Sequence, residues 1–534
     1  MDFRDPKTQQ LITKPYSSTL ECGFFFNSNL NGKADKLKLE IIKSKSGIDT
    51  CKVNGILLHS MYDPFKEAER FASFTPIFNP KYIAVTEPAL SYSSNFLRKK
   101  FPHARLICIR YTDMFTEYDS TWDKTFVLSE NTCENLFNYM GEDGIAQCIF
   151  LSWKASESAF KNEYEKCWNQ IKECVLKSQS VLATQSFFSI RWLKNSFRFF
   201  MTEKKLAGIS KGNSPILVCA SGTSLESSIK KIREHRNKFF LIAVSSALSP
   251  LVNSSIMPDL CISTDGGFWA KPHIGRIIKD KNITLALSPE SSIYSQILTQ
   301  TPVIPLNYGD GCSKDLFNDF KVNGISARRN GTVSGTALEL AKSITTGPVF
   351  LTGLDLSSAM GFQHTQPNEN EKINSLADNR LKTKETRIAP QTFPSHSLEI
   401  YCQWFKNYDN AENVYRLSSN HSFNNTLGKI KDINWNDFES MADNFKTDFP
   451  EIKLQKNSEI LDFKKRLQLL ENSLSKNMDS ISWKKELFPG EMINLERCLE
   501  TETSKAEAAK KSIKMKQKKI TESILDPYRK AGTK

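Results

Sequence analysis

The sequence predicts an α/β protein with a doubly wound, mostly parallel sheet at its core. Short apolar runs, typical of buried strands, alternate with helical stretches between residues 205 and 355. Small polar residues and glycines follow these runs, where the carboxyl ends of strands would lie. Nearer the N-terminus, two more apolar runs flank one helical stretch and have the spacing of a β-α-β unit.

The chain has 534 residues, enough for roughly three domains of about 100–200 residues each. We expect an N-terminal α/β domain over 1–200, a central doubly wound domain over 205–430 and a helical C-terminal domain with a basic tail over 431–534. Hydrophobic residues make up 39% and charged residues 25% of the sequence. These values exclude a disordered chain, a collagen-like chain and a small disulfide scaffold.

About half of the net charge of +13, six charges, lies in the tail, where seven lysines between Lys505 and Lys519 are opposed only by Glu507. The body of the chain therefore has a modest basic excess, and we expect no nucleic-acid partner. Twelve cysteines form no CxxC pair, which favours reduced thiols inside cores over zinc sites. No apolar run approaches the roughly 20 residues of a membrane-spanning helix, and the N-terminus lacks the order of a signal peptide. We expect a cytoplasmic protein with no membrane span.

The elements follow from the same patterns. Asp63 before Pro64 is typical of a helix cap and a first-turn proline, so Phe65–Phe74 is expected to be helical. Further helices are expected at Asn95–Lys100, Leu225–His235, Ala247–Val252 and Ser334–Ile344. Strands are expected at Tyr82–Thr86, Ala104–Arg110, Ile216–Cys219, Phe239–Val244, Asp259–Ser263, Ile283–Leu287, Val303–Leu306 and Pro348–Thr352. Residues 363–395 are polar and interrupted by prolines, as long functional loops often are.

The C-terminal segment changes to a helical period. Apolar residues recur at three- and four-residue spacing at Ile460, Phe463, Leu467, Leu470 and Leu474. Pro489-Gly490 ends this helix and a basic helix follows, which predicts a hairpin or bundle. The repeat is short, so packing onto the body is favoured over coiled-coil self-association.

In doubly wound sheets, ligands bind at the carboxyl ends of strands. The turn Ser221-Gly222-Thr223-Ser224 would offer backbone N–H groups and a helix start to a phosphate, unless it is a simple turn. After the next strand, the hydroxyl of Ser246 could face a base or ribose, or cap a helix.

Asp265, followed by Gly266 and Gly267, could bind a ribose, hold a cation, position an acceptor or cap a turn. Trp269 and His273 lie on one helical face and could touch the same site, although a lone helical histidine is more often structural.

Asp355 follows the last expected strand of this region, and His364 opens the long polar loop. A histidine there could be a general base near neutral pH or a hydrogen-bonded loop residue. Arg329 precedes a helix start at Gly331, Thr332 and Ser334, which could be an anion site or an ordinary cap with solvated arginines.

Taken together, these segments resemble the motility-associated (Maf) flagellin glycosyltransferases. The core of that family is similar to bacterial sialyltransferases and to archaeal-type 6-hydroxymethylpterin diphosphokinases (MptE-like proteins). The resemblance covers roughly residues 55–405. It rests on ordered segments at Leu58–Arg70, Thr86–Tyr92, Ala220–Leu225, Pro258–Gly267, Arg329–Ser334, Thr352–Leu356 and Gln363–Thr365.

The resemblance implies a Rossmann-like, sialyltransferase-like core. It also implies transfer of a nonulosonic (sialic-acid-like, pseudaminic or legionaminic type) sugar from a CMP-activated donor to Ser or Thr of flagellin, in flagellum assembly and motility. His364 would be the catalytic base, with Asp265 as its rival. Nucleotide contacts would come from Ser221, Gly222, Thr223, Ser224, Ser246, Arg329, Gly331, Thr332, Ser334 and Asp355. Contacts to the donor or acceptor sugar would come from Gly266, Trp269, His273 and Gln363. The sequence assigns no metal ligand, and Mg²⁺ stays open.

The first loop of the family usually reads Gly-x-Gly-Pro-Ser-Leu, and this chain departs from it at Ala220 and Thr223. Two other functions stay open. One is a diphosphokinase acting on a small pterin-like substrate with Mg-ATP, in which Asp265 and Asp355 would hold the metal. The other is a catalytically idle flagellin-binding assembly factor. The C-terminal helices are expected to hold the flagellin acceptor or a flagellin chaperone.

Overall fold

The computed structural model describes residues 38–75, 78–280, 283–356, 364–387, 396–418, 425–442, 444, 448–455, 462–498 and 502–532. The chain divides into two compact units. The first unit comprises residues 1–187 and 487–516, and the second comprises residues 188–486 and 517–534. The boundaries of the three expected domains stay a prediction.

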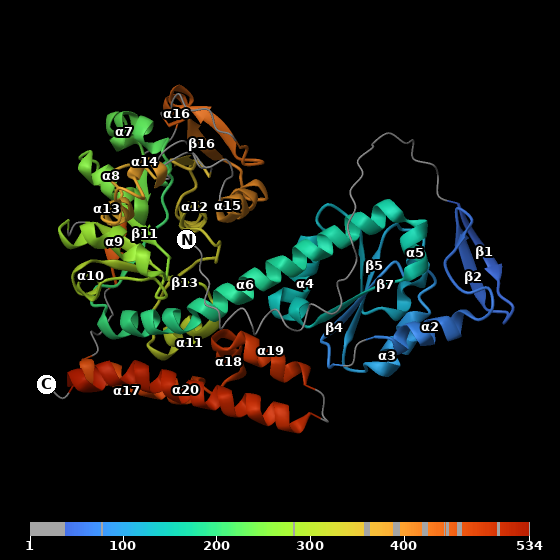
Figure 1. Cartoon of the computed structure of the whole chain (residues 1–534). Coiled ribbons are helices and arrows are strands. Elements are labelled where there is room, and N and C mark those ends of the chain that lie inside the picture. Colours follow the sequence, from blue (N-terminus) through green and yellow to red (C-terminus); the bar gives the residue numbers. More distant parts are fainter. Residues whose placement is uncertain are drawn as a thin grey trace. The chain divides into compact units, whose positions relative to one another are not determined.

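The first unit contains two sheets (Figure 1). The smaller sheet is antiparallel and consists of β1 (Leu39–Lys43), β2 (Asp49–Val53) and β3 (Ile56–Leu57). The larger sheet has the strand order β6-β5-β4-β7 and is parallel throughout. Its strands are β4 (Tyr82–Thr86), β5 (Arg105–Arg110), β6 (Lys124–Val127) and β7 (Cys148–Ser152). The helices of the first unit are α2 (Pro64–Ser73), α3 (Ser93–Lys100), α4 (Thr132–Ala146), α5 (Lys154–Ala159), the start of α6 (Lys161–Thr202), α19 (Pro489–Arg497) and the start of α20 (Thr503–Gly532).

Helices cover both faces of the larger sheet at its central strands β4 and β5, so nearly all residues of these two strands are buried. Ile83 of β4 packs in one apolar cluster with Leu97 of α3, and Ala84 packs in another with Leu136 of α4. The expected helix cap is present, since the Asp63 carboxylate accepts from the amides of Phe65 and Lys66 at the start of α2. The predicted β-α-β unit is therefore confirmed.

The second unit is built on a nine-stranded sheet of order β14-β13-β12-β11-β10-β9-β15-β16-β17, and every neighbouring pair is parallel. Its strands are β9 (Ile216–Cys219), β10 (Phe240–Val244), β11 (Leu260–Ser263), β12 (Thr284–Leu287), β13 (Val303–Asn307), β14 (Ile325–Ser326), β15 (Val349–Thr352), β16 (Val414–Ser418) and β17 (Lys431–Asn434). A separate antiparallel pair joins β8 (Ala207–Ile209) to β18 (Ile452–Leu454). The predicted doubly wound α/β fold is confirmed.

Helices connect these strands and pack on the sheet (Figure 1). They are α7 (Leu225–Glu234), α8 (Leu248–Asn253), α9 (Lys271–Ile274), α10 (Ser295–Gln300), α11 (Gly311–Asp319), α12 (Val333–Ile344), α13 (Glu369–Ser375), α14 (Lys384–Arg387), α15 (His396–Lys406) and α16 (Trp435–Ala442). The central strands β9 and β10 are buried along their whole length, which is why they read as unbroken apolar runs.

The helical stripe of the C-terminal segment forms α17 (Phe463–Asn477), followed by α18 (Ile481–Leu487). Leu470 and Leu474 are buried, and Ser473 donates a hydrogen bond to Asp319 of α11 at 2.6 Å. Trp483 of α18 is fully buried, and its indole N–H donates to Asp315 of α11 at 2.9 Å. The expected packing of this segment onto the body of the protein is confirmed.

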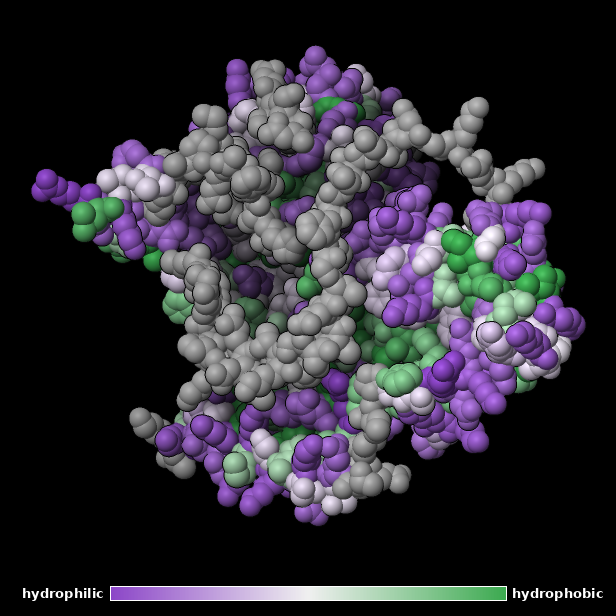
Figure 2. Space-filling model, turned by 45° about the vertical axis from the view of Figure 1, so that its right-hand side comes forward, coloured by the Kyte–Doolittle hydropathy of each residue, from purple (hydrophilic) through white to green (hydrophobic). Residues whose placement is uncertain are grey.

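In the part of the chain that the structure describes, no helix combines the length and the apolar character that crossing a bilayer requires. Hydrophilic residues predominate among the coloured atoms on the face displayed in Figure 2. Each described cysteine is a free thiol, and all of them except Cys498 are buried. The prediction of reduced cysteines inside cores is confirmed for these residues.

Candidate functional site

The strand order of the nine-stranded sheet places a topological switch point between β9 and β15. The chain moves outward from β9 through β10 to β14 and then returns to β15 on the opposite side of β9. Connections that leave two neighbouring strands in opposite directions open a crevice at the strands' carboxyl ends. The turn Ser221–Ser224 follows β9 and the turn Gly353–Leu356 follows β15, so both turns line this crevice.

Asp355 holds the first turn in place. Its Oδ2 accepts from the Thr223 hydroxyl at 3.1 Å and from the Ser224 amide at 2.9 Å, and its Oδ1 accepts from the Ser224 hydroxyl. The side chain of Asp355 is 3% exposed. Both carboxylate oxygens are therefore directed at the turn, not at the open crevice.

Gly222 is needed where the two turns meet. Its amide donates to the carbonyl oxygen of Gly353 at 2.7 Å, and a Cβ at this position would lie 2.6 Å from Cγ of Asp355. Gly353 itself has φ of +67°, in the left-handed region that favours glycine. The close approach of the two turns thus requires both glycines.

Two amides of the first turn stay available. Those of Gly222, Ser224 and Leu225 have partners within the two turns. Those of Ser221 and Thr223 find no partner among the residues that the structure describes. Free N–H groups at a strand-to-helix turn are suited to the oxygens of a phosphate.

His364 lies directly against this turn. Its Nδ1 is 3.0 Å from the hydroxyl oxygen of Ser221, which also accepts from the Ser246 hydroxyl at 2.7 Å. The next residue anchors the segment, because the Thr365 amide donates to the Ser221 carbonyl at 2.8 Å and its hydroxyl donates to the Gly222 carbonyl at 2.6 Å. Three of the predicted site residues, Ser221, Ser246 and His364, are thus in direct contact.

Burial lowers the pKa of His364, while a hydrogen bond with the Ser221 backbone and the charge of Asp355 oppose that shift. The imidazole is therefore neutral at pH 7. When Nδ1 carries the proton and donates to Ser221, Nε2 carries a lone pair that can accept one.

His273 occupies the same neighbourhood. Burial, followed by the charge of a protonated His364, lowers its pKa to about 4. Its Nε2 is 2.9 Å from the amide nitrogen of Asn370 on α13. Asn368, which caps α13, and Asn370 each have a buried amide atom, Nδ2 and Oδ1 respectively, without a partner. These groups give the crevice polar atoms that a hydroxyl-rich ligand could satisfy.

Asp265 is exposed beyond the end of β11, and its Oδ1 accepts from the Gly267 amide at 2.7 Å. Burial raises the pKa of Tyr401 on α15, and the negative charge of Asp265 raises it further. The same charge partly opposes the lowering of the pKa of His273. Trp269 is 44% exposed. Gly266 packs so closely on Trp192 that a Cβ there would overlap the indole ring.

Arg329 is held by two carboxylates. Its guanidinium makes two hydrogen bonds of 2.6 Å to Glu290 and further ones of 3.0–3.1 Å to Asp310. It also lies 4.5 Å from the ring centroid of Tyr308. Burial alone would lower the pKa of Arg329, but the hydrogen bonds and charges of Glu290 and Asp310 outweigh it and raise that pKa. A phosphate at this residue would have to compete with both carboxylates.

The residues after Arg329 start α12. Gly331 has φ of +68°, and Thr332 is the N-cap residue without a side-chain cap bond. Helices that connect parallel strands begin at the strands' carboxyl edge, so Ser334 and its neighbours lie at the edge that carries the crevice. The amide nitrogen of Asn330 is buried there without a partner. The last predicted residue, Gln363, lies outside the described residues.

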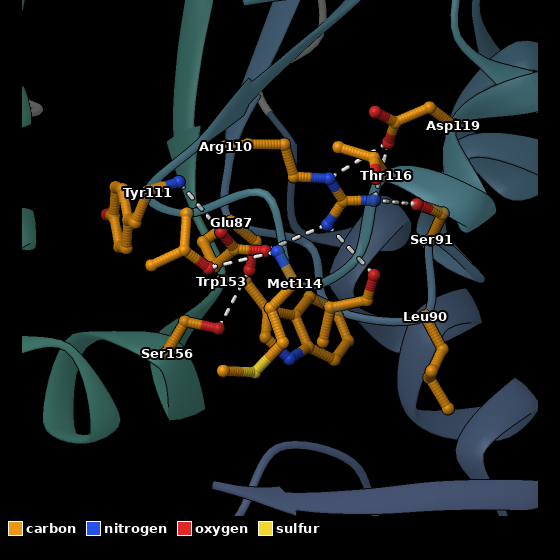
Figure 3. Close-up of polar contacts among 12 residues, drawn as sticks. Glu87, Leu90, Ser91, Arg110, Tyr111, Met114, Thr116, Asp119, Trp153 and Ser156 are labelled. Carbon is orange, nitrogen blue, oxygen red and sulfur yellow. Dashed lines mark hydrogen bonds and ion pairs between the residues drawn. The ribbon is translucent and has the colours of Figure 1, made fainter. Parts of the chain in front are cut away.

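The parallel sheet of the first unit has a switch point too, between β4 and β7, but its own side chains fill that place (Figure 3). Arg110 is fully buried and donates to Glu87 at 2.8 Å and to Asp119 at 2.6 and 2.9 Å. Its remaining bonds go to the Ala89 carbonyl and the Ser91 hydroxyl, both at 2.9 Å. Every donor nitrogen of Arg110 is used, so the candidate site lies in the second unit.

The sequence did not point to several residues that build the site. Asn425 donates from its amide to the Asp355 carbonyl at 2.8 Å, and the fully buried Arg416 donates to Asn425 at 2.8 Å. Tyr401 lies close to the start of α12, since its ring is 3.8 Å from a Cβ built on Gly331. Isolated polar or aromatic residues in helices and loops carry no motif, so only the fold could identify them.

Comparison with known proteins agrees with this picture. A family model described as 6-hydroxymethylpterin diphosphokinase MptE-like matches residues 190–360, the segment that contains the first turn, Asp265, Arg329 and Asp355. An uncharacterized protein of Treponema pallidum (strain Nichols) is 28% identical over 309 residues, covering 58% of this chain and 67% of that protein.

The structure of a Maf glycosyltransferase from Magnetospirillum magneticum AMB-1 is similar to this chain, with a TM-score of 0.52 and 12% sequence identity. The likeness covers 93% of both chains. The expected resemblance to Maf and MptE-like proteins is confirmed, and the fold is that of a Maf glycosyltransferase.

Proposed function

We propose that this chain is a glycosyltransferase that moves a nonulosonic sugar from a CMP-activated donor to a Ser or Thr hydroxyl of flagellin. The observation that carries the proposal is the contact of His364 with Ser221 at the switch point of the glycosyltransferase-like sheet. This contact places a neutral histidine beside a turn with free amides. Sugar transfer from a nucleotide needs a base for the acceptor hydroxyl and hydrogen-bond donors for the departing phosphate.

In this mechanism the acceptor oxygen attacks the anomeric carbon of the sugar while the bond from that carbon to the CMP phosphate breaks. Nε2 of His364 takes the hydroxyl proton, and Nδ1 stays fixed by Ser221. The amides of Ser221 and Thr223 and the start of α12 stabilise the departing phosphate. Asp355 contributes by holding the turn, since its oxygens are engaged by Thr223 and Ser224.

The competing function is the diphosphokinase named by the family model, which covers the core of the second unit. In that function Asp265 and Asp355 would hold Mg²⁺, but both carboxylate oxygens of Asp355 accept hydrogen bonds from the turn instead. Thermal melts with CMP or with Mg-ATP separate the two. Stabilisation by CMP favours the transferase, and stabilisation by Mg-ATP alone favours the kinase.

The decisive experiment weighs intact flagellin after incubation with the purified chain and a CMP-activated nonulosonic sugar. Wild type and His103→Ala, an exposed histidine in the first unit, are expected to add one sugar mass per modified residue. His364→Ala is expected to lose the transfer while still binding CMP. Transfer by His364→Ala would remove the proposed base, and no transfer by wild type despite flagellin binding would favour an assembly factor.

A further inference from the structure

A cavity of about 320 Å³ in the second unit lies apart from the β9–β15 turns. It is lined by Lys194, Arg198, Thr202, Ser295, Ser523, Ile524, Pro527 and Tyr528, from α6, α10 and α20. All eight residues belong to the same unit. None of them takes part in the proposed transfer.

The lining combines positive charge with hydroxyl groups. Lys194 and Arg198 supply the cations, and Thr202, Ser295 and Tyr528 supply hydroxyl donors. The fourth lining hydroxyl, that of Ser523, donates to the Ile520 carbonyl at 2.8 Å. No lining residue is acidic. Glu522 and Asp526, the acids of this part of α20, are exposed and do not line the cavity.

These cations have no carboxylate to balance them. Within the described ranges, neither Lys194 nor Arg198 forms an ion pair, and the one side-chain bond of Arg198 goes to the Asn195 amide oxygen at 3.3 Å. A third cation is close, because burial and then the charge of Arg198 lower the pKa of Lys271. Clustered like charges without a counter-charge destabilise a fold unless an anion binds among them.

We propose that this cavity binds the phosphoryl group of a small ligand. A guanidinium, an ammonium and several hydroxyls supply more donors than the two oxygens of a carboxylate can accept. A tetrahedral dianion can use them. The Tyr528 hydroxyl stays a donor at neutral pH, since burial raises its pKa although Arg198 opposes the shift.

The cavity and the proposed transfer site share one short element. Helix α9 carries Lys271, whose pKa is lowered by burial and then by the charge of Arg198, and His273, which is in contact with Asn370. After burial, the charge of a protonated His364 also lowers the pKa of His273. An anion in the cavity therefore lies one helix away from the crevice, but it binds there independently of the sugar donor.

The test is calorimetric titration of the full chain with inorganic phosphate, and with acetate at equal ionic strength. Phosphate is expected to bind and acetate is not. Lys194→Gln with Arg198→Gln should weaken phosphate binding by about tenfold or more, and Tyr528→Phe, which keeps both charges, by a few-fold. The exposed Lys230→Gln makes the same charge change outside the cavity and should bind like wild type.

Asp355→Asn alters the phosphate-binding turn of the donor site and should leave intact the phosphate binding that the Lys194→Gln, Arg198→Gln variant loses. This result therefore does not depend on the proposed function. Melting curves of each variant establish that it is folded. Equal phosphate affinity in wild type and in the folded Lys194→Gln, Arg198→Gln double variant would overturn the proposal. Acetate binding as tight as phosphate binding would overturn the assignment to a phosphoryl group.

Discussion

Asp355 binds Ser224 through both of its carboxylate oxygens, Oδ2 accepting from the Ser224 amide at 2.9 Å and Oδ1 from the Ser224 hydroxyl. One acid thereby ties the turn after β15 to the turn after β9. Each of these turns follows a fully buried strand, so the acid fixes their relative position at the mouth of the crevice.

Replacing Asp355 with Asn puts an amide NH₂ where one of these acceptors stands, which leaves a buried donor facing another donor. We expect a loss of about 1–3 kcal/mol in the free energy of unfolding and a clear loss of CMP affinity. Urea denaturation and calorimetry measure the two effects. Asp409→Asn is the control, because that side chain is 95% exposed; unchanged CMP binding in Asp355→Asn would contradict the role given to this acid.

Gly222→Ala tests the close approach of the two turns. The added methyl would lie 2.6 Å from both Cγ of Asp355 and the Gly353 carbonyl oxygen, so the turn must shift. We expect weaker CMP binding and a lower melting temperature. Gly490→Ala is a matched control, since nothing lies within 4 Å of its Cβ position. Wild-type CMP affinity in Gly222→Ala would show that the turn has room to spare.

His273 makes stability depend on pH. Its pKa falls from an ordinary 6.5 to about 4 in the folded chain, so the unfolded chain binds more protons between these values. Stability is therefore complete above pH 6.5 and is lost as the pH falls towards 4, by about 2 kcal/mol between pH 7 and pH 5. His273→Gln should flatten this part of the stability curve, measured by urea denaturation at each pH. The exposed His103→Gln should keep the slope, and an equally steep slope in His273→Gln would assign the effect to another group.

Arg110→Ala tests the network that fills the switch point of the first unit. Removing the guanidinium leaves Glu87 fully buried without its cation, and we expect a loss of about 3–5 kcal/mol. Burial raises the pKa of Glu87 although Arg110 opposes this, so the variant should protonate that carboxyl more readily. Urea denaturation measures the loss, with Arg105→Ala on the exposed first position of β5 as control. A loss below about 1 kcal/mol would mean that the network is not needed to fill this place.

The sequence predicted those parts of the fold whose residues are buried on both sides. Strand β9 reads as an apolar run because all four of its residues are buried, and it was predicted with the bounds that it has. Strand β17 was not predicted, because most of its side chains are exposed and its composition is that of a loop. The 42-residue helix α6 was also missed, since polar residues are interspersed among its apolar ones.

Site residues could be predicted from the sequence where they directly follow a predicted strand. The hydrogen-bond partners that come from distant segments of the chain could not be predicted. The turn after β9 and Asp355 could be placed at one sheet edge from the strand pattern alone. The sequence does not reveal that Glu290 and Asp310 hold Arg329, because these acids follow other strands. The roles expected for these residues in catalysis and binding stay predictions.

The contact between Ser221 and His364 joins positions 143 residues apart in the chain. Thr365 adds two further bonds from the same segment to the turn. Grafting a turn of different sequence in place of Ser221–Ser224 would remove the Ser221 hydroxyl that contacts His364. The transferable part is therefore the turn and the histidine segment together, exchanged as one cassette.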